Sequence, residues 1–512
     1  MIRTARNLGR LFVIIRTLAR HDALFPSELG DMLPGLALFA RLISRRGVAG
    51  RPGQRLAGAL AELGPTFIKL GQALSTRSDL VGAEIAADLA RLQDRLPPFS
   101  GDTAAAIVEE QLEKPLDRIF QSFDRNAIAA ASIAQVHFAV TIDGKEVAVK
   151  ILRPGIEHAF RRDVNLLYWL TEMALRLQPR LRRLRPIEIV EMFERTTGIE
   201  MDLRMEAAAA SELAANFRDD PWFRVPRVDW DRTAKHVLTL ERIHGIKVDE
   251  TEKLLAAGHD LSKVTAIASA AYFNQVFRDG YFHADLHPGN LFVNETGGVT
   301  AVDFGIMGRL DRTTRYYLAD MLLGFLTGDY RRVAQVHFQA GYVASHQSQE
   351  MFTQACRAIG EPLLNKPLNE ISVGRLLAQL FAVTEQFEME TQPQLLLLQK
   401  SMLTAEGVGR ALNPEINMWE LARPLIENWM REHRGPEAHV LDEAEAFFKA
   451  LRQVPEAIRS TKRTVELLER GIRLDPDTVA ALVQAGSRRY RTELWALWGA
   501  VAALAGTVAW LL

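Results

Sequence analysis

Hydrophobic and polar positions along the chain change their period several times, and each change marks a different predicted element. Between Pro52 and Glu113 apolar residues recur with helical spacing, interrupted at Gly64-Pro65 and at Pro97-Pro98. From Leu116 to Val149 the pattern alternates and is rich in β-branched residues. Asp143-Gly144 lies between two such runs, so this stretch predicts a β-hairpin with a tight turn.

Helical spacing returns from about Ile156 to Phe217, followed by a short predicted strand at His236–Arg242. Beyond Glu250 the pattern is helical except for two short pieces, Asn290–Val293 and Val299–Val302. The predicted fold is therefore α+β, with a small β-rich lobe before a larger helical lobe. The predicted parts are an N-terminal helical extension, a β-rich lobe, a helical lobe, a helical segment and a terminal apolar helix: residues 1–115, 116–248, 249–430, 431–493 and 494–512.

The C-terminal segment Leu494–Leu512 contains no charged residue. As a helix it would reach about 28 Å, close to the thickness of a bilayer core. Tryptophans lie near its ends, and Arg488, Arg489 and Arg491 precede it, which favours a cytoplasmic position for the preceding domain. We predict a single transmembrane anchor; a buried core helix is the alternative.

The N-terminal segment is amphipathic and lacks the features of a signal peptide. Leu8, Leu11, Phe12 and Ile15 share one helix face, and arginines, Arg10 among them, occupy the other. Amphipathicity alone does not distinguish a helix on an anionic membrane surface from one packed on the protein.

Composition narrows the function little. The formal net charge of −1 gives no indication of nucleic-acid binding. The single cysteine, Cys356, excludes an internal disulfide and fits a reducing compartment.

Candidate chemistry is concentrated in three segments. Phe282–Asn290 (FHADLHPGN) resembles the catalytic loop of protein kinases, in which an aspartate meets the attacking group and an asparagine five residues later holds a metal. Asp285 and Asn290 have this spacing. Asp303 begins a D-F-G element after a predicted strand, and Lys150 ends a predicted VAVK strand, as does the kinase lysine that contacts the α- and β-phosphates. The matches occur in the kinase order and predict an ATP- and magnesium-binding core.

A metal-dependent hydrolase is an alternative, because His283, Asp285 and His287 alternate and would point the same way on an extended segment. This alternative leaves Asn290, Asp303 and the lysine of the VAVK strand unexplained. In the other interpretation, His283 braces the backbone of the loop.

Two kinase features are missing. Instead of a G-x-G-x-x-G segment, the alanine-rich Ile128–His137 precedes Lys150. Alanines allow close approach to phosphate but restrict φ where glycine would not. No A-P-E follows the D-F-G element, which argues against a conventional peptide-docking segment.

Further segments complete the pattern. Lys69-Leu70-Gly71-Gln72 (K-x-G-Q) lies in a predicted helix with Lys69 and Gln72 on one face, a spacing that by itself favours a solvated surface pair. Together with AAASIAQVH, Glu200-Met201-Asp202, HADLHPGN and QPQLLLLQKSMLTAEGVG, it makes the chain resemble the UbiB family of atypical protein-kinase-like proteins over nearly its whole length. The resemblance implies a two-lobed protein-kinase-like fold in which the K-x-G-Q extension folds over the active site.

The resemblance also implies roles for individual residues. Lys150 would have Glu206 as its ion-pair partner, with Glu200 in reserve, and Glu200 and Asp202 would form an acidic motif facing Lys69. On one continuous helix Glu200 and Glu206 would point about 120° apart and serve different partners, whereas Asp202 and Glu206 would share a face. Catalytic roles fall to Asp285, Lys69 and Gln72, and metal binding to Asn290 and Asp303. Nucleotide contacts fall to Ala129, Ala130, Ala131, Ser132, Lys150, Glu200, Asp202, Glu206 and, on the hinge strand, Glu241.

We therefore expect a membrane-bound atypical kinase or ATPase that uses ATP and magnesium and supports ubiquinone biosynthesis at the bacterial inner membrane. The expected partners are membrane lipid, prenylated quinone precursors and other ubiquinone biosynthesis proteins, with no nucleic acid; a homodimer is left open. The alternatives are a protein kinase acting in trans and a nucleotide-binding pseudokinase scaffold. The sequence contains no flavin fingerprint and no convincing iron-ligand set, so we expect any role in ring hydroxylation to be indirect.

Overall fold

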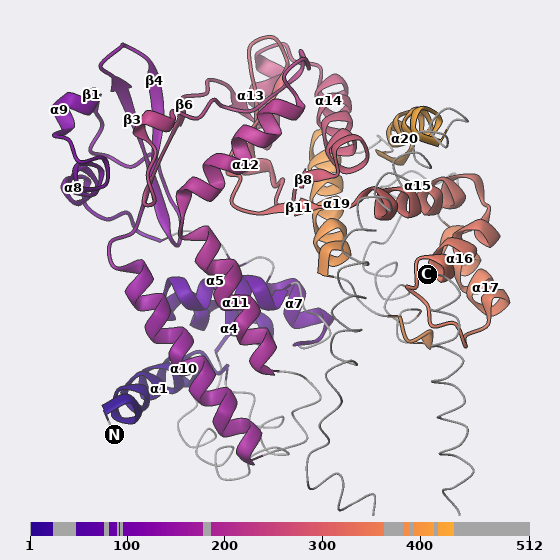
Figure 1. Ribbon diagram of the computed structural model, residues 1–512, viewed down its shortest axis with the longest axis horizontal. Helices are drawn as coiled ribbons and strands as arrows, with labels where there is room; N and C mark the ends of the chain where they lie inside the picture. The colour runs from indigo at the N-terminus through magenta and orange to yellow at the C-terminus, as the bar shows by residue number, and fades with distance from the viewer. Residues whose placement is uncertain are drawn as a thin grey trace, which may run out of the picture. The chain divides into compact units, whose positions relative to one another are not determined.

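The computed structural model of the protein describes residues 2–23, 48–75, 81–89, 92, 96–177, 186–362, 383, 386–389, 393–413 and 418–434 (Figure 1). The chain divides into two units, Met1–Arg431 and Glu432–Leu512, and only residues 432–434 of the second unit are described. The predicted anchor, residues 494–512, lies outside the described residues, as does nearly all of the predicted segment 431–493. Of the helices that the structure describes, none is both long enough and apolar enough to cross a membrane.

The N-terminal helices pack against two long helices that follow the hairpin, and Figure 1 shows the two groups side by side. Their shared core includes Leu60, Phe67, Ile68 and Leu166. The extension consists of α1 (Ile2–Arg20), α4 (Pro52–Leu63), α5 (Pro65–Ser75) and α7 (Ala83–Leu89), and the long helices are α10 (Ile156–Leu177) and α11 (Pro186–Glu200). The predicted break at Gly64 is confirmed, with φ of +102° at this helix end.

Helix α1 packs on the protein. Ile14 is buried, and Arg10 donates two 2.9 Å hydrogen bonds to the carboxylate of Asp163, which is 2% exposed. Of the two alternatives for this segment, packing on the protein agrees with these contacts, although Arg10 points to the buried Asp163 carboxylate and not to solvent, because burial of a carboxylate requires a cation beside it. Phe12, by contrast, is 63% exposed.

The predicted hairpin is confirmed as β3 (Ala134–Thr141) and β4 (Glu146–Leu152), joined through Gly144 with φ of +81°. The antiparallel sheet has the order β1-β3-β4-β6, with β2 paired to β3. Alternation along β4 points Val149 and Ile151 toward α8, so Lys150 faces the opposite side, where Leu152 packs against α12. The remaining elements of this lobe are α8 (Gly101–Leu112), α9 (Leu116–Ile119), β1 (Phe120–Phe123), β2 (Ala129–Ala130), α12 (Leu203–Asn216), the short 3₁₀ turn η2 (Trp230–Arg232) and β6 (Val237–Glu241).

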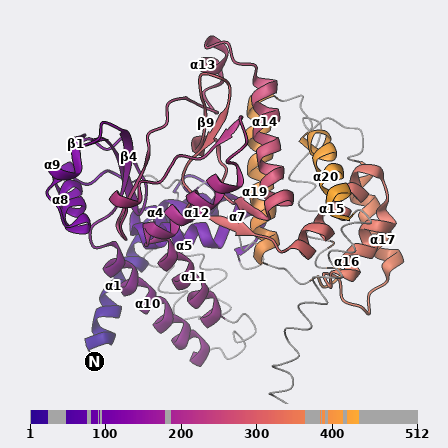
Figure 2. The same ribbon diagram turned by 45° about the horizontal axis from the view of Figure 1, so that its top comes forward.

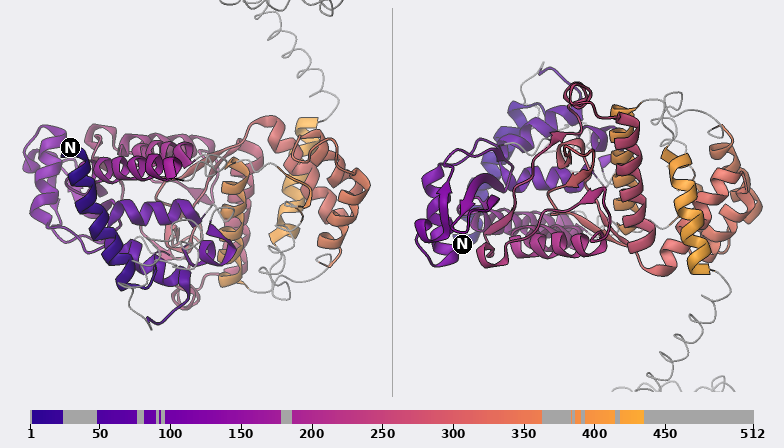
Figure 3. Two further views of the ribbon diagram at one scale, coloured as in Figure 1. Left: turned by 90° about the horizontal axis from the view of Figure 1, so that it is seen from below. Right: turned by 90° about the horizontal axis from the view of Figure 1, so that it is seen from above.

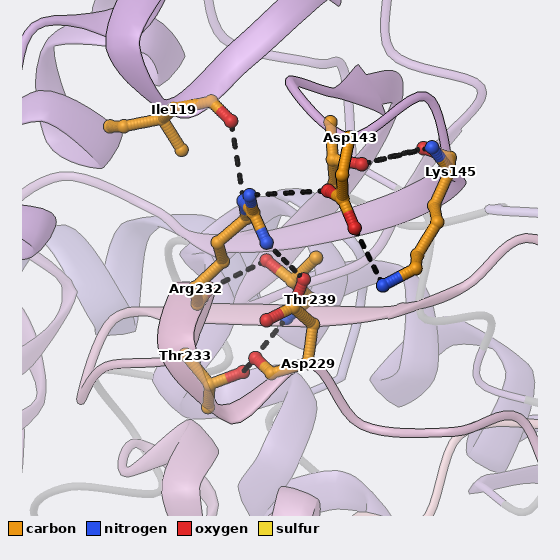
Figure 4. Close-up of polar contacts among 8 residues, drawn as sticks. Ile119, Asp143, Lys145, Asp229, Arg232, Thr233 and Thr239 are labelled. Carbon is orange, nitrogen blue, oxygen red and sulfur yellow. Dashed lines mark hydrogen bonds and ion pairs between the residues drawn. The ribbon is translucent and has the colours of Figure 1, made fainter.

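One arginine braces the outer part of this sheet (Figure 4). The Arg232 guanidinium donates to the carbonyl of Ile119 at 3.2 Å and to the carboxylate of Asp229 at 2.7 Å, and reaches Asp143 at 3.5 Å. The hydroxyl of Thr239 donates to the carbonyl of Arg232 at 2.6 Å. These contacts tie the hairpin turn at Asp143 and the residue before β1 to β6, the strand that pairs with β4 and Lys150.

The second lobe is mainly helical, as predicted, around a core that includes Phe273, Phe282, Phe304 and Trp429. Figures 2 and 3 show α19 alongside α14, and the two helices are in contact. The strands of this lobe are β5 (Phe223–Arg224), β7 (Ile246–Lys247), β8 (Tyr281–His283), β9 (Leu291–Val293), β10 (Val299–Ala301) and β11 (Met307–Arg309). The helices are α13 (Thr251–Ala256), α14 (Leu261–Phe273), the π-helical turn η3 (Asn274–Asp279), the 3₁₀ turn η4 (Pro288–Asn290), α15 (Arg312–Thr327), α16 (Tyr330–Gln339), α17 (Gln349–Gly360), α19 (Pro393–Leu412) and α20 (Met418–Arg434).

Candidate functional site

Lys150 lies at the centre of a group of charges drawn from three distant segments. Its ammonium donates to both carboxylate oxygens of Glu206 on α12, at 2.8 and 3.0 Å, and to Oδ1 of Asp303 at 2.9 Å. The predicted ion pair between Lys150 and Glu206 is therefore present. Glu206 is 7% exposed, so Glu200 is not needed as the reserve partner.

Two carboxylates that share one ammonium titrate differently. Burial opposes the charge on Lys150, but Asp303 and Glu206 outweigh it and raise the pKa of the lysine. The charge of Lys150 lowers the pKa of Asp303, whose side chain is half exposed. Burial raises the pKa of Glu206 to about 7. The attraction of Lys150 opposes this rise, but the neighbouring Asp303 carboxylate partly cancels that attraction. This cluster therefore holds a fixed cation beside a carboxylate that stays ionised.

The helix that was expected to run continuously from Glu200 to Glu206 is interrupted between these two residues. Glu200 ends α11, and Asp202 is the N-cap of α12: its carboxylate accepts from the backbone N–H of Arg204 at 3.1 Å and pairs with the Arg204 guanidinium at 2.7 Å. An aspartate favours this capping position because its short side chain satisfies a backbone donor left unpaired at the helix start. The expectation that Asp202 shares a helix face with Glu206 was therefore wrong. The charged partner that the structure gives Asp202 is Arg204.

Lys69 and Glu200 form the contact that holds the K-x-G-Q helix α5 to α11. Their charged atoms are 2.7 Å apart and both side chains are 11% exposed. Glu200 therefore faces Lys69 as the resemblance implies, and Lys69 is not the solvated surface residue that its spacing to Gln72 favoured. Gly71 permits the close packing of α5 on α4, since a Cβ there would lie 2.8 Å from the Leu60 side chain. Gln72 lies one helix position further, partly buried. The charge of Lys69 also helps to lower the pKa of Asp303, so the K-x-G-Q segment acts electrostatically on the candidate site.

His283 braces the loop that carries Asp285. It is fully buried; Nδ1 accepts from the backbone N–H of Asp285 at 3.1 Å and Nε2 is 3.2 Å from the carbonyl of Val302. Burial lowers the pKa of His283, which keeps the ring neutral as this pair of bonds requires. Nδ1 of His287 accepts from the backbone N–H of Gly289. Both nitrogens of His283 thus serve the backbone, and the metal-hydrolase interpretation was wrong for this residue.

The catalytic-loop and D-F-G segments are joined by hydrogen bonds. The side-chain amide of Asn290 donates to the carbonyl of Asp285 at 3.1 Å, and the backbone N–H of Val302 donates to the carbonyl of Asn290 at 2.9 Å. Asp303 follows with a φ of +63°, a conformation that aspartate tolerates better than most residues. Because the side-chain nitrogen of Asn290 donates to the carbonyl of Asp285, the side-chain oxygen of Asn290 faces away from that carbonyl. The oxygens of Asn290 and Asp303 suit Mg²⁺, which takes one or two protein ligands plus phosphate oxygens.

The alanine-rich loop is held by an arginine. Ala129 and Ala130 form β2, and the carbonyl of Ala131 accepts from the Arg153 guanidinium at 3.1 and 2.9 Å. Ser132 is fully buried beside this turn. At the end of β6, the carboxylate of Glu241 accepts from the backbone N–H of Arg227 at 3.3 Å. The nucleotide roles of Ala129, Ala130, Ala131, Ser132 and Glu241 stay predictions.

One residue in contact with the candidate catalytic aspartate was not predicted. The ammonium of Lys400 on α19 lies 3.3 Å from Oδ1 of Asp285. Lys400 interrupts the apolar helical run in QPQLLLLQKSMLTAEGVG, and a charge in such a run is the signal that could have identified it. Sequence spacing could not connect it to Asp285, because 115 residues separate the two.

Comparison with known proteins places these residues in a family. The chain matches the family model described as "ABC1 atypical kinase-like domain" over residues 91–337 and the one described as "UbiB helical domain" over residues 356–417. A Marinobacter nauticus protein named "Probable protein kinase UbiB" is 44% identical over 388 residues, covering 75% of this chain and 71% of that protein. The chain belongs to the UbiB family. A Pseudomonas putida protein with the same printed name is 40% identical over 501 residues, covering 95% of this chain and 90% of that protein.

The family assignment shows a mixed helix–sheet, kinase-like fold and separates the charged residues by region. Lys150, Glu206, Asp285 and Asp303 lie within the kinase-like match, and Lys400 lies in the UbiB helical domain. A solved structure, the Rv3197–erythromycin complex from Mycobacterium tuberculosis, is 26% identical over 72% of this chain and 93% of that chain, with a TM-score of 0.48. That likeness is too low to add to the UbiB assignment.

Proposed function

We propose that the protein is an atypical kinase or ATPase that binds ATP with magnesium and supports ubiquinone biosynthesis at the bacterial inner membrane. The observation that carries the proposal is the contact of Lys150 with Glu206 and Asp303, beside a loop in which Asp285 and Asn290 are joined by a hydrogen bond. A polyphosphate requires a cation on one side and metal-holding oxygens on the other, and these residues supply both.

In the proposed reaction, the bond between the γ-phosphorus and the β–γ bridging oxygen breaks and ADP leaves with that oxygen. A bond forms between the γ-phosphorus and an oxygen of water or of an acceptor hydroxyl, whose proton passes to the Asp285 carboxylate. Asp303 and Asn290 would hold magnesium, which neutralises charge on the phosphate oxygens. Lys150 would orient the α- and β-phosphates.

The membrane and the biosynthetic partners belong to the same proposal. Membrane attachment is supported by the uncharged segment 494–512 and the arginines before it. The proposed partners are prenylated quinone precursors and other ubiquinone biosynthesis proteins, a proposal supported by the resemblance to the UbiB family. The alanine-rich turn and the K-x-G-Q helix favour a small or membrane-borne acceptor over a peptide.

Phosphate release by the purified full chain tests the proposal. The assay adds MgATP, then liposomes and a prenylphenol-like compound, with a general protein substrate in parallel. Asp303→Asn removes a charge that would hold magnesium, so phosphate release should fall by at least a hundredfold. Asp249→Asn, a substitution at an exposed aspartate, is the matched control and should change nothing.

The outcomes separate the candidate functions. Release that responds to lipid or phenol and is lost in Asp303→Asn supports the proposal. Labelling of the protein substrate favours a kinase acting in trans. Nucleotide binding without release under any condition indicates a pseudokinase scaffold, and wild-type protein that binds no nucleotide refutes the proposal.

A further inference from the structure

Helix α19 of the UbiB helical domain brings a second lysine into the candidate site. Lys400 lies 3.3 Å from the carboxylate of Asp285, and the two side chains are 35% and 34% exposed. A ligand that reaches Asp285 from solvent therefore also reaches the ammonium of Lys400.

Buried contacts fix the position of this lysine. The adjacent Ser401, fully buried, shares a 2.7 Å hydrogen bond with the hydroxyl of Tyr272 on α14. Leu286, the neighbour of Asp285, lines a small cavity together with Ala405 of α19. The backbone of α19 beside Lys400 is thus fixed to α14, and Lys400 reaches Asp285 from a defined helix position.

The contacts of Lys150 place its charge at one end of a bound polyphosphate. Lys150 is bound to Glu206 and Asp303, at the end where the α- and β-phosphates would lie. Asp285 marks the other end, where the acceptor attacks the γ-phosphorus. Negative charge on the three γ-phosphoryl oxygens must be stabilised there, and a preorganised cation is an effective way to do so.

We infer that Lys400 is a further catalytic residue, which contacts an oxygen of the transferred γ-phosphoryl group. The inference rests on the proposed function and names the residue that completes the site. When the β–γ bridging bond breaks and the acceptor oxygen bonds to phosphorus, the acceptor proton passes to Asp285. Lys400 keeps its own proton throughout and moves only from the Asp285 carboxylate toward the phosphoryl oxygen.

The test compares nucleotides with and without a γ-phosphate. Affinities of the full-length wild type, Lys400→Ala and Lys400→Arg for MgATP and MgADP are measured by calorimetry. Lys400→Ala should weaken MgATP binding about tenfold and leave MgADP binding within twofold, because ADP lacks the group that Lys400 contacts. Phosphate release at saturating ATP should fall about a hundredfold. Lys400→Arg keeps the charge and should restore most of the preference for ATP.

Matched measurements make the result decisive. Lys253→Ala removes an exposed lysine on α13 and should behave as wild type. Equal losses of MgATP and MgADP affinity in Lys400→Ala would assign it a structural role and overturn the inference. An unchanged preference of Lys400→Ala for MgATP over MgADP would also overturn the inference. So would faster phosphate release, which would mean that the ion pair with Lys400 inhibits Asp285. If the wild type binds neither nucleotide, the proposed function fails first.

Discussion

Replacing Lys69 by alanine removes one partner of the ion pair that joins the K-x-G-Q helix to α11. The charged atoms of Lys69 and Glu200 are 2.7 Å apart, which at an effective dielectric constant of about 20 corresponds to a gross attraction of about 6 kcal/mol. Desolvation of two side chains that are 11% exposed offsets most of this, leaving a coupling of about 1–3 kcal/mol. The single substitution should cost about 3 kcal/mol, because it leaves Glu200 nearly buried without that cation.

A double-mutant cycle measures the coupling directly. Unfolding free energies are determined by chemical denaturation for the wild type, Lys69→Ala, Glu200→Ala and the double variant. The exposed pair Lys253–Glu250 provides the control cycle, for which about 0.5 kcal/mol or less is expected. MgATP affinity of folded Lys69→Ala should also change, because Lys69 acts on Asp303.

A coupling for Lys69 and Glu200 no larger than that of the control pair would refute the reasoning from burial. Unchanged nucleotide affinity in a folded Lys69→Ala protein would separate the K-x-G-Q segment from the candidate site. It would reduce Lys69 to a structural residue of the interface between α5 and α11.

Three further predictions follow from burial and charge. Burial raises the pKa of Glu206 from 4.5 to about 7, so the folded state holds this proton more tightly than the unfolded chain. The stability that this group contributes is therefore lost as the pH rises from 4.5 to 7. The urea midpoint of Glu206→Gln should depend less on pH in that window than the midpoint of the wild type. An equal slope in both proteins would contradict this. Gly71→Val should lower the unfolding free energy by about 2 kcal/mol through overpacking, measured by urea titration. Arg10→Ala should cost about 2–3 kcal/mol by leaving the buried Asp163 carboxylate with less compensation, whereas Arg20→Ala, at an exposed pair, should cost less than about 1 kcal/mol in the same assay.

Local pattern predicted the elements that carry the candidate site. The alternation and the Asp143-Gly144 turn predicted the hairpin and placed Lys150 on one strand. The spacing within FHADLHPGN predicted that Asp285 and Asn290 belong to one loop, which the hydrogen bond between them confirms. These features depend on neighbours a few residues apart, so periodicity and turn chemistry contain the information.

Other features could not be predicted from the pattern of neighbouring residues. The short strands β8 and β11 pair with each other across the catalytic loop and the D-F-G element and were not predicted, since three-residue strands have too little alternation to be recognised. The break at Asp202 was missed because helical spacing continues on both sides of it.

Residue type and spacing along the chain predicted the kind of site, because they encode each of its parts: a lysine on a strand, a catalytic loop and a D-F-G aspartate in kinase order. The family resemblance had already implied the pairs of Lys150 with Glu206 and of Lys69 with Glu200, which the structure contains. The contacts of Lys150 with Asp303 and of Lys400 with Asp285 became known only from the packing of the folded chain. The physical reason is that an ion pair depends on distance and burial between segments up to 153 residues apart, and packing of the helices sets both.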